Sequence, residues 1–192
     1  MTDGKQRGRK RKRGGRRDKA SAGSATASRI RLCRVDATGD AAEYEFVFPR
    51  DVREREDDLE EVRRMLEMGE IDVAVDELRW LVGGCEGLLE GHRLLGEIAA
   101  EEGDWELARA HFGYAYDLGL KALPQGFAGR LPFRRLSNRP MFYAADGLAR
   151  CLVHLGDFDQ AKAIWRQMAT WDPDDPLQAV RKIDDPKSCL TD

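Results

Sequence analysis

Residues 93–119, RLLGEIAAEEGDWELARAHFGYAYDLG, decide the fold of this chain. Apolar residues recur every three or four positions on both sides of the Gly103-Asp104 pair, which places them on one face of each of two helices. We therefore predict two short amphipathic helices joined by a tight turn. The predicted apolar faces carry Leu94, Leu95, Ile98 and Ala99 before the turn, and Leu107, Ala108, Phe112 and Ala115 after it.

The same turn occurs three times. A glycine followed by an acidic residue stands at positions 69–70, 103–104 and 156–157, and an alanine follows each pair at a fixed distance: Ala74, Ala108 and Ala161. The first two alanines are 34 residues apart, and the next interval is 53, which is 34 plus an insertion of 19. A small residue at this place lets two helices cross closely. A large apolar residue stands four positions later in every unit and is predicted to fill the space between units: Leu78, Phe112 and Trp165.

A helix–turn–helix unit that repeats every 34 residues is the signature of the tetratricopeptide repeat. The chain resembles this family over roughly residues 55–173, where Leu95-Gly96 and Leu148-Ala149 give the large–small pair of the first helices and Pro173 follows the last helix. The first unit departs from the pattern, with Glu61-Val62 at the pair. The resemblance implies an all-α fold, a tetratricopeptide-like α-solenoid. The alternative is three unrelated helical hairpins that share a turn by chance.

The repeats define the predicted organisation of the chain. The helical domain is expected to span residues 50–183, with repeats at about 55–88, 89–122 and 142–173, an insertion loop at 123–140 and a capping helix at 176–183. Residues 184–192 are expected to fray. Residues 29–49 are predicted to be extended or to form a β-hairpin, because charged and apolar residues alternate on both sides of a turn at 37–40. Two strands alone are marginal, so they must lean on the helices, pair with another chain or stay partly loose.

Residues 1–28 have a different composition. The first twenty residues hold ten Lys or Arg and two Asp, so they carry +8, and the rest of the chain carries −11 of the net −3. We expect this arm to be disordered, because its basic part has no apolar anchor and cannot bury enough surface to fold. Such an arm binds the phosphates of nucleic acid in a salt-sensitive way, and the alternatives are a solubilising tail or an arm that folds back on the acidic body. The candidate polyanion-binding residues are Arg9, Lys10, Arg11, Lys12, Arg13, Arg16 and Arg17.

The sequence offers no catalytic constellation. It contains no glycine-rich phosphate loop, no Gly-x-Ser-x-Gly motif and no paired histidines at metal-ligand spacing. Cys151 and His154 lie three residues apart on one predicted helix, but two ligands do not make a metal site. Cys85 and Cys151 are expected to be small core residues. We therefore expect neither an enzyme nor a cofactor or metal, and we expect a cytoplasmic protein with no membrane partner.

The resemblance also implies a binding surface. In tetratricopeptide arrays the first helix of each repeat lines a concave groove that binds peptides or partner helices. In this register the groove residues are Arg63, Arg93, Glu97, Tyr143, Asp146, Arg150 and His154. The places of the lysine and asparagine clamp that binds chaperone carboxylates in some members hold Leu59, Arg63, Leu94, Tyr143 and Gly147, which argues against that ligand.

The insertion loop is a second candidate surface, because arginines and aromatic residues recur at binding hot spots. Its candidate residues are Phe127, Arg130, Phe133, Arg134, Arg135 and Arg139. The other interpretation is that Phe127, Leu131 and Phe133 cover the edge of the second repeat. Two functions follow from these patterns. One is a non-catalytic interaction module with a protein partner, and the other is a protein that associates with nucleic acid or ribosomes through the basic arm.

Overall fold

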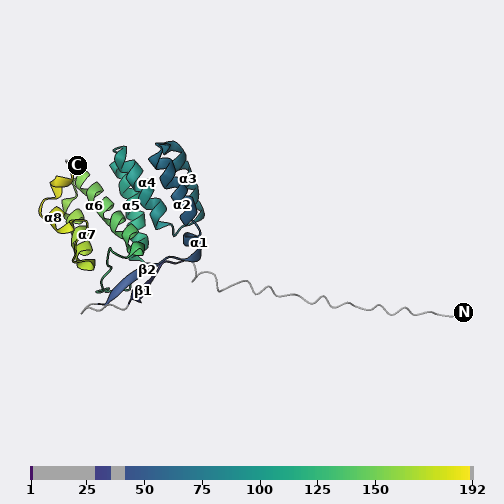
Figure 1. Ribbon diagram of the computed structural model, residues 1–192, viewed down its shortest axis with the longest axis horizontal. Coiled ribbons are helices and arrows are strands. Elements are labelled where there is room, and N and C mark those ends of the chain that lie inside the picture. Colours follow the sequence, from purple (N-terminus) through teal and green to yellow (C-terminus); the bar gives the residue numbers. More distant parts are fainter. Residues whose placement is uncertain (2–28, 36–41, 191–192) are drawn as a thin grey trace.

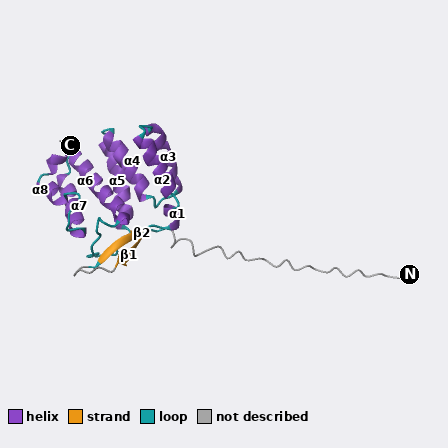
Figure 2. Cartoon of the chain, viewed as in Figure 1, coloured by secondary structure: helices purple, strands orange, loops and turns teal. Residues whose placement is uncertain are grey.

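The computed structural model describes residue 1, residues 29–35 and residues 42–190. This part of the chain is mostly helical, with one small antiparallel sheet across one end of the helices (Figures 1 and 2). The strands are β1 (Arg31–Val35) and β2 (Glu43–Val47). The α-helices are α1 (Arg50–Arg53), α2 (Glu56–Glu67), α3 (Ile71–Gly84), α4 (Leu89–Glu101), α5 (Trp105–Leu120), α6 (Arg139–His154), α7 (Phe158–Trp171) and α8 (Ala179–Asp184). The prediction of a mostly helical chain is confirmed. Before the helices, where an extended segment or a hairpin was expected, the two strands pair antiparallel.

Three helix pairs succeed one another along the molecule: α2 with α3, α4 with α5, and α6 with α7 (Figure 1). Each pair contacts the next, through α3 against α4 and α5 against α6, and α8 packs on α7. None of the helices in the part of the chain that the structure describes is long and apolar enough to cross a lipid bilayer. The predicted disordered arm, apart from Met1, and the predicted hairpin turn lie outside the described residues.

The turn inside each pair has the same backbone geometry. Gly69, Gly103 and Gly156 have φ of 78°, 78° and 84°, a left-handed conformation that glycine adopts without steric cost. In each turn the amide of the next residue donates to a carbonyl five residues back: Glu70 to Met65, Asp104 to Ala99, and Asp157 to Leu152, at 2.8–2.9 Å. This is the glycine-terminated helix end that satisfies carbonyls left over by the last turn. Asp104 and Asp157 then cap the following helix by accepting from Leu107 and Gln160.

The small residues of the repeat are buried within the helix pairs. Ala74, Ala108 and Ala161 are fully buried, and the large residues four positions later are buried beside them. Phe112 of α5 lies against two glycines, Gly96 of α4 and Gly147 of α6. The ring therefore occupies the space between the second and third helix pairs, as the sequence pattern predicts.

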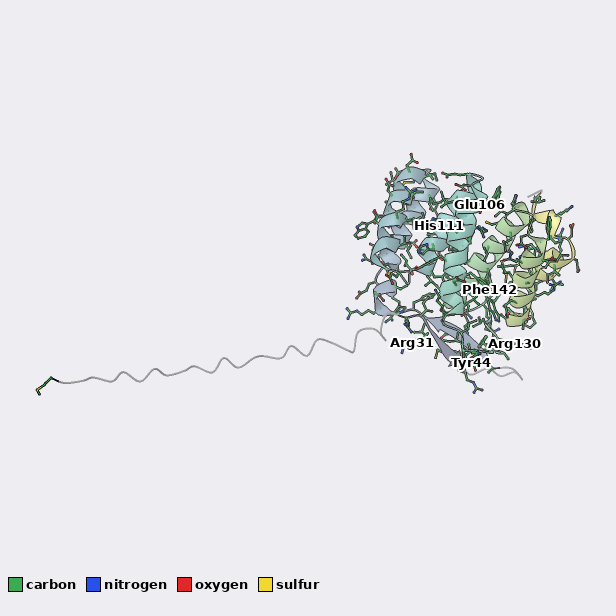
Figure 3. The ribbon with its side chains drawn as sticks, turned by 180° about the vertical axis from the view of Figure 1, so that it is seen from behind. Arg31, Tyr44, Glu106, His111, Arg130 and Phe142 are labelled. Atoms are coloured by element: carbon green, nitrogen blue, oxygen red, sulfur yellow. The ribbon has the colours of Figure 1, made fainter. Side chains whose placement is uncertain are left out.

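The insertion between α5 and α6 is ordered and fastens the sheet to the helices. Arg130 forms a parallel bridge with Glu43 of β2: the Tyr44 amide donates to the Arg130 carbonyl at 2.8 Å, and the Arg130 amide donates to the Ala42 carbonyl at 2.9 Å (Figure 3 labels Tyr44 and Arg130). Asn138 is fully buried at the end of the insertion. Its side-chain oxygen accepts from the Phe46 amide at 3.1 Å, and its side-chain nitrogen donates to the carbonyls of Tyr44 and Pro132 at 3.0 Å each. A single side chain thus joins the sheet, the insertion and the start of α6.

Two boundaries differ from the sequence-based predictions. The first helix of the third pair begins at Arg139, inside the predicted insertion, because Pro140 suits the first turn of a helix. The expectation that residues 184–192 fray is wrong for residues 186–190, which form the 3-10 helix η2 (Pro186–Leu190). Pro186 and Cys189 are buried there, and η2 packs on α6, α7 and α8. The chain therefore adds a second cap beyond the predicted capping helix, which the structure forms as α8.

Candidate partner-binding groove

Helices α2, α4 and α6 carry seven residues that sequence analysis assigned to a groove, and all seven line two adjoining hollows. The first hollow has a volume of about 460 Å³ and includes Glu97, Tyr143, Asp146, Arg150 and His154. The second has a volume of about 350 Å³ and includes Arg63, Arg93 and Tyr143. Tyr143 belongs to both, so the two hollows join at its side chain. We call their combined surface the groove.

The second hollow is a network of buried and half-buried charges. Arg93 is buried, with its Nε 2.7 Å from a carboxylate oxygen of Glu90, and it also pairs with Glu97. Arg63 reaches the same Glu90 from α2 at 3.0 Å. Burial alone lowers the pKa of Arg93, but Glu90 and Glu97 outweigh that effect and raise it, so the guanidinium stays charged. The guanidinium also lies over the ring of Tyr143, 5.6 Å from its centre.

The first hollow is more aromatic. Trp105 of α5 stacks on His154 of α6, with ring centres 3.5 Å apart and planes 7° from parallel. Burial and the charge of Arg150 lower the pKa of His154, which favours its neutral form. Arg150 is exposed, and within the described residues no carboxylate forms an ion pair with it. The Arg150 guanidinium is therefore available to a ligand, whereas those of Arg63 and Arg93 are already paired.

Asp146 lines the first hollow, but its charge is already paired within this chain. Its carboxylate accepts a hydrogen bond from Trp165 Nε1 at 2.8 Å and pairs with Lys182 Nζ of α8 at 2.7 Å. Both partners belong to this chain, and the carboxylate is mostly buried. Asp146 thus holds the capping helix on α6, and it contributes to the wall of the groove rather than a free charge.

The predicted loop surface is largely used inside the molecule. Phe127 packs edge-on against Tyr44, and Phe133 contacts both Phe142 and Tyr143. The arginines are engaged as well: Arg130 through its backbone with β2, Arg134 with Glu43, Arg135 with Glu45 at 3.7 Å, and Arg139 with the Phe133 ring and carbonyl. Phe127 thus contacts the sheet, Phe133 contacts α6, and the sheet is the main contact of the arginines.

Some residues of the groove escaped sequence analysis. Glu90 and Trp105 line it beside the predicted residues. Glu90 stands three residues before Arg93, and this spacing is typical of an ion pair on a helix. It is the sequence feature that could have placed Glu90 beside Arg93. Trp105 comes directly after a turn, where no periodic pattern assigns a face. The arm residues Arg9 to Arg17 lie outside the part of the chain that the structure describes.

No model of a protein family matches the chain, and no curated protein sequence matches it.

Proposed function

We propose that this chain is a tetratricopeptide-like interaction module, without catalytic activity, that binds a segment of a partner protein in the groove and works in the cytoplasm. The observation that carries the proposal is the convergence of three helices on one surface. Residues from α2, α4 and α6 that are far apart in sequence line a continuous pair of hollows. The 34-residue spacing and the three matching turns support a repeat architecture.

The chemistry of the groove favours a segment with an apolar or aromatic anchor beside an acidic group. The Trp105–His154 stack and Tyr143 offer flat aromatic surface, and such surface gives large contact area at low entropic cost. Arg150 is the exposed cation next to that surface. We therefore propose that Tyr143 and Arg150 contribute most to binding, while Arg63, Arg93 and Asp146 shape the walls.

The test is capture of partners from native lysate by the full chain and by a Tyr143→Ala, Arg150→Ala double variant. The matched control is Tyr114→Ala with Arg109→Ala, which removes the same residue types from exposed positions of α5 outside the groove. We expect the groove variant to lose a specific partner that the control variant keeps. The proposal fails if both variants keep every partner or if the control loses as much as the groove variant. Circular dichroism and melting confirm that each variant folds.

The second candidate function is association with nucleic acid or ribosomes through the basic arm. It is supported by the division of charge, with +8 in residues 1–20 against −11 in the remainder. Binding of this kind weakens steeply with salt, because each neutralised phosphate releases counterions. Nuclease treatment of the lysate separates the two functions. Partners that depend on the arm disappear with nuclease, whereas a partner of the groove survives it.

A further inference from the structure

Strand β1 forms the outer edge of the small sheet. On one side it pairs with β2, and the far side of β2 is covered by Arg130 of the insertion, so the order across the sheet is insertion, β2, β1. Within the described residues no strand lies beside the other side of β1. Figure 2 shows the sheet at the margin of the molecule, beyond the ends of the helices. No residue of β1 lines either hollow of the groove, so this edge is a separate surface.

Three hydrogen bonds of β2 show how its backbone is oriented. The Tyr44 amide donates to the Arg130 carbonyl, the Tyr44 carbonyl accepts from the Asn138 side chain, and the Phe46 amide donates to the same side chain. Residues 44 and 46 therefore direct their backbone groups toward the insertion. Since successive residues of an antiparallel strand direct these groups to opposite sides, residues 43, 45 and 47 direct theirs toward β1.

The orientation of β1 follows from its register with β2. The residues opposite positions 43, 45 and 47 are Val35, Cys33 and Arg31. These three use their backbone groups to pair with β2, so the amides and carbonyls of Leu32 and Arg34 point to the outer edge. In the part of the chain that the structure describes, the one contact to these groups is a weak one from the Cys33 thiol, 3.5 Å from the Arg34 carbonyl. The edge is thus open to a further strand.

The side chains along this edge are basic. Arg29, Arg31 and Arg34 are exposed, and none of the carboxylates that the structure describes forms an ion pair with them. The two carboxylates of β2, Glu43 and Glu45, are already paired with arginines of the insertion. A second copy of β1 at this edge would bring two sets of unpaired arginines into one contact, and like charges across strands are destabilising. The charge of the edge therefore disfavours self-association and favours an acidic strand.

We propose that β1 binds an extended acidic segment of a partner protein, which adds to the sheet antiparallel to β1. The amides and carbonyls of Leu32 and Arg34 exchange hydrogen bonds with the added strand. Arg34 and Arg31 are three positions apart, so carboxylates at positions i and i+3 of the segment stand opposite them. The residue opposite Leu32, at i+2, is apolar, because Leu32 packs against the main buried cluster. The third strand stabilises a sheet that has only two strands of its own.

The probe is a rhodamine-labelled peptide, Ser-Glu-Thr-Val-Glu-Thr amide, titrated into the full chain and followed by fluorescence anisotropy. Its two glutamates oppose Arg34 and Arg31, and its valine opposes Leu32. N-methylation of the first glutamate and the valine removes the two amides directed at β1. N-methylation of the first threonine and the second glutamate removes two amides directed away, and this peptide is the matched control. The basic arm attracts all three peptides alike, because their charges are equal.

We expect the unmodified peptide and the outward-methylated peptide to bind, and the inward-methylated peptide to bind at least about tenfold more weakly, because it lacks two hydrogen bonds. Binding of the unmodified peptide should also slow hydrogen exchange at the amides of Leu32 and Arg34. The amides of residues 31, 33 and 35 should change less, because they are already paired with β2.

Variants of β1 test the same contact from the side of the chain. Arg31→Gln and Arg34→Gln should each weaken binding of the unmodified peptide by about two- to fivefold. Arg34→Pro should weaken it by about tenfold or more, because it removes the charge together with an amide that β2 does not use. Arg166→Gln is the matched control, since Arg166 is an exposed arginine of α7 for which no ion pair is present among the described residues. It should bind as the parent does.

Several results would overturn strand addition at β1. Equal binding of the two methylated peptides, or no binding of the unmodified peptide by the parent, would exclude pairing through the backbone. Unchanged binding in the Arg31 and Arg34 variants, or an equal loss in Arg166→Gln, would exclude β1 as the contact. A loss in the Tyr143→Ala, Arg150→Ala variant would place the peptide in the groove instead. Thermal melts without peptide reveal any loss of structure separately, and the outcome is independent of whether the groove binds a partner.

Discussion

The ring of Phe112 packs so closely on α4 and α6 that two positions, Gly96 and Gly147, have no room for a side chain. A β-carbon on Gly96 would lie 2.9 Å from ring atoms, and one on Gly147 would lie 2.5 Å from them, closer than side-chain carbons pack. Both glycines are inside helices, so their backbone conformation does not require glycine. Their role is steric: they let α4 and α6 approach the two sides of α5.

We predict that Gly147→Ala lowers the free energy of unfolding by about 1–3 kcal/mol, the usual cost of overpacking. Gly113→Ala is the matched control in α5, where the new methyl group meets only Leu148 at 3.8 Å. Its helix propensity should make it neutral or up to about 1 kcal/mol stabilising. Urea denaturation measures both. Equal effects of the two changes would contradict the packing described here.

Asn138 concentrates three hydrogen bonds in one buried amide. We predict that Asn138→Ala lowers the free energy of unfolding. The loss should be about 1–3 kcal/mol for each backbone group of Phe46, Tyr44 or Pro132 that water cannot reach after the change. Ser137→Ala, one residue away, should be nearly neutral. Hydrogen exchange of the Phe46 amide gives a local readout, because that amide should lose its protection only in the Asn138 variant. Protection that persists would show that the sheet is held by other contacts.

The helix crossings could be predicted from the sequence, whereas the hydrogen bonds of Asn138 could not. Ala74, Ala108 and Gly96 follow from the repeat, because close helix crossings demand small side chains at fixed intervals. Asn138 bonds to residues 92 and 94 positions away, and no local pattern encodes such a contact. Asp146 was placed on the correct helix face, but its partner Lys182 comes from α8, and that partner decides whether the carboxylate is free. Positions on a helix face were predictable, and engagement by distant elements was not.

At the scale of elements, the α4–α5 hairpin contains a titration that opposes folding in acid. His92 of α4 and His111 of α5 form a half-buried histidine pair with their Nδ1 atoms 3.3 Å apart, and burial together with His111 lowers the pKa of His92. The pKa of His92 is about 4 in the folded chain against about 6.5 when unfolded. Between these values the unfolded chain binds the extra proton, so stability rises with pH there. The contribution of neutral His92 is complete above about pH 6.5 and is lost as pH falls toward 4.

We therefore predict that the urea concentration at the unfolding midpoint of the parent decreases as the pH is lowered from 7.5 to 5. The His92→Gln variant should show a weaker dependence of this midpoint on pH. The control is His154→Gln. Its imidazole stacks on Trp105 at the groove, and its pKa is also lowered, but it faces Arg150 rather than a second histidine. We expect a smaller change of slope in that variant. Parallel pH profiles in the parent and in His92→Gln would contradict the coupling of the histidine pair to folding.

The insertion is the element for which the sequence left two roles open, a contact surface for a partner or a cover over the second repeat. Arginines between aromatic residues are typical of binding surfaces, and that composition favoured a contact role. The acidic residues that neutralise Arg134 and Arg135 are on β2, about ninety residues earlier, where their alternation with apolar residues indicated only a strand. In this chain the arginines and aromatic residues of the insertion therefore connect the sheet to α6.

At the scale of the whole molecule, the buried core of the described residues begins at Ile30. Ile30 is the first residue of the main buried cluster, which continues through the sheet, the third helix pair and Cys189 of η2. The first two helix pairs add their own cluster around Leu78 and Leu81. Every described buried residue thus lies between positions 30 and 189, outside the basic segment. The fold and the arm are separable in their chemistry.

We predict that removal of residues 1–28 leaves the melting temperature unchanged to within about 2 °C, because the described buried residues lie outside this segment. In a domain of this size a loss of 1 kcal/mol would lower the melting temperature by about 2–4 °C. The same deletion should abolish salt-dependent retention on heparin, since it leaves a body of strongly negative charge. If the chain of residues 29–192 has a much lower melting temperature than the full chain, the arm packs on the acidic helices. If the shortened chain is still retained on heparin, the helices bind the polyanion. Arg150 is the exposed cation of the groove, so Arg150→Ala should then abolish the retention.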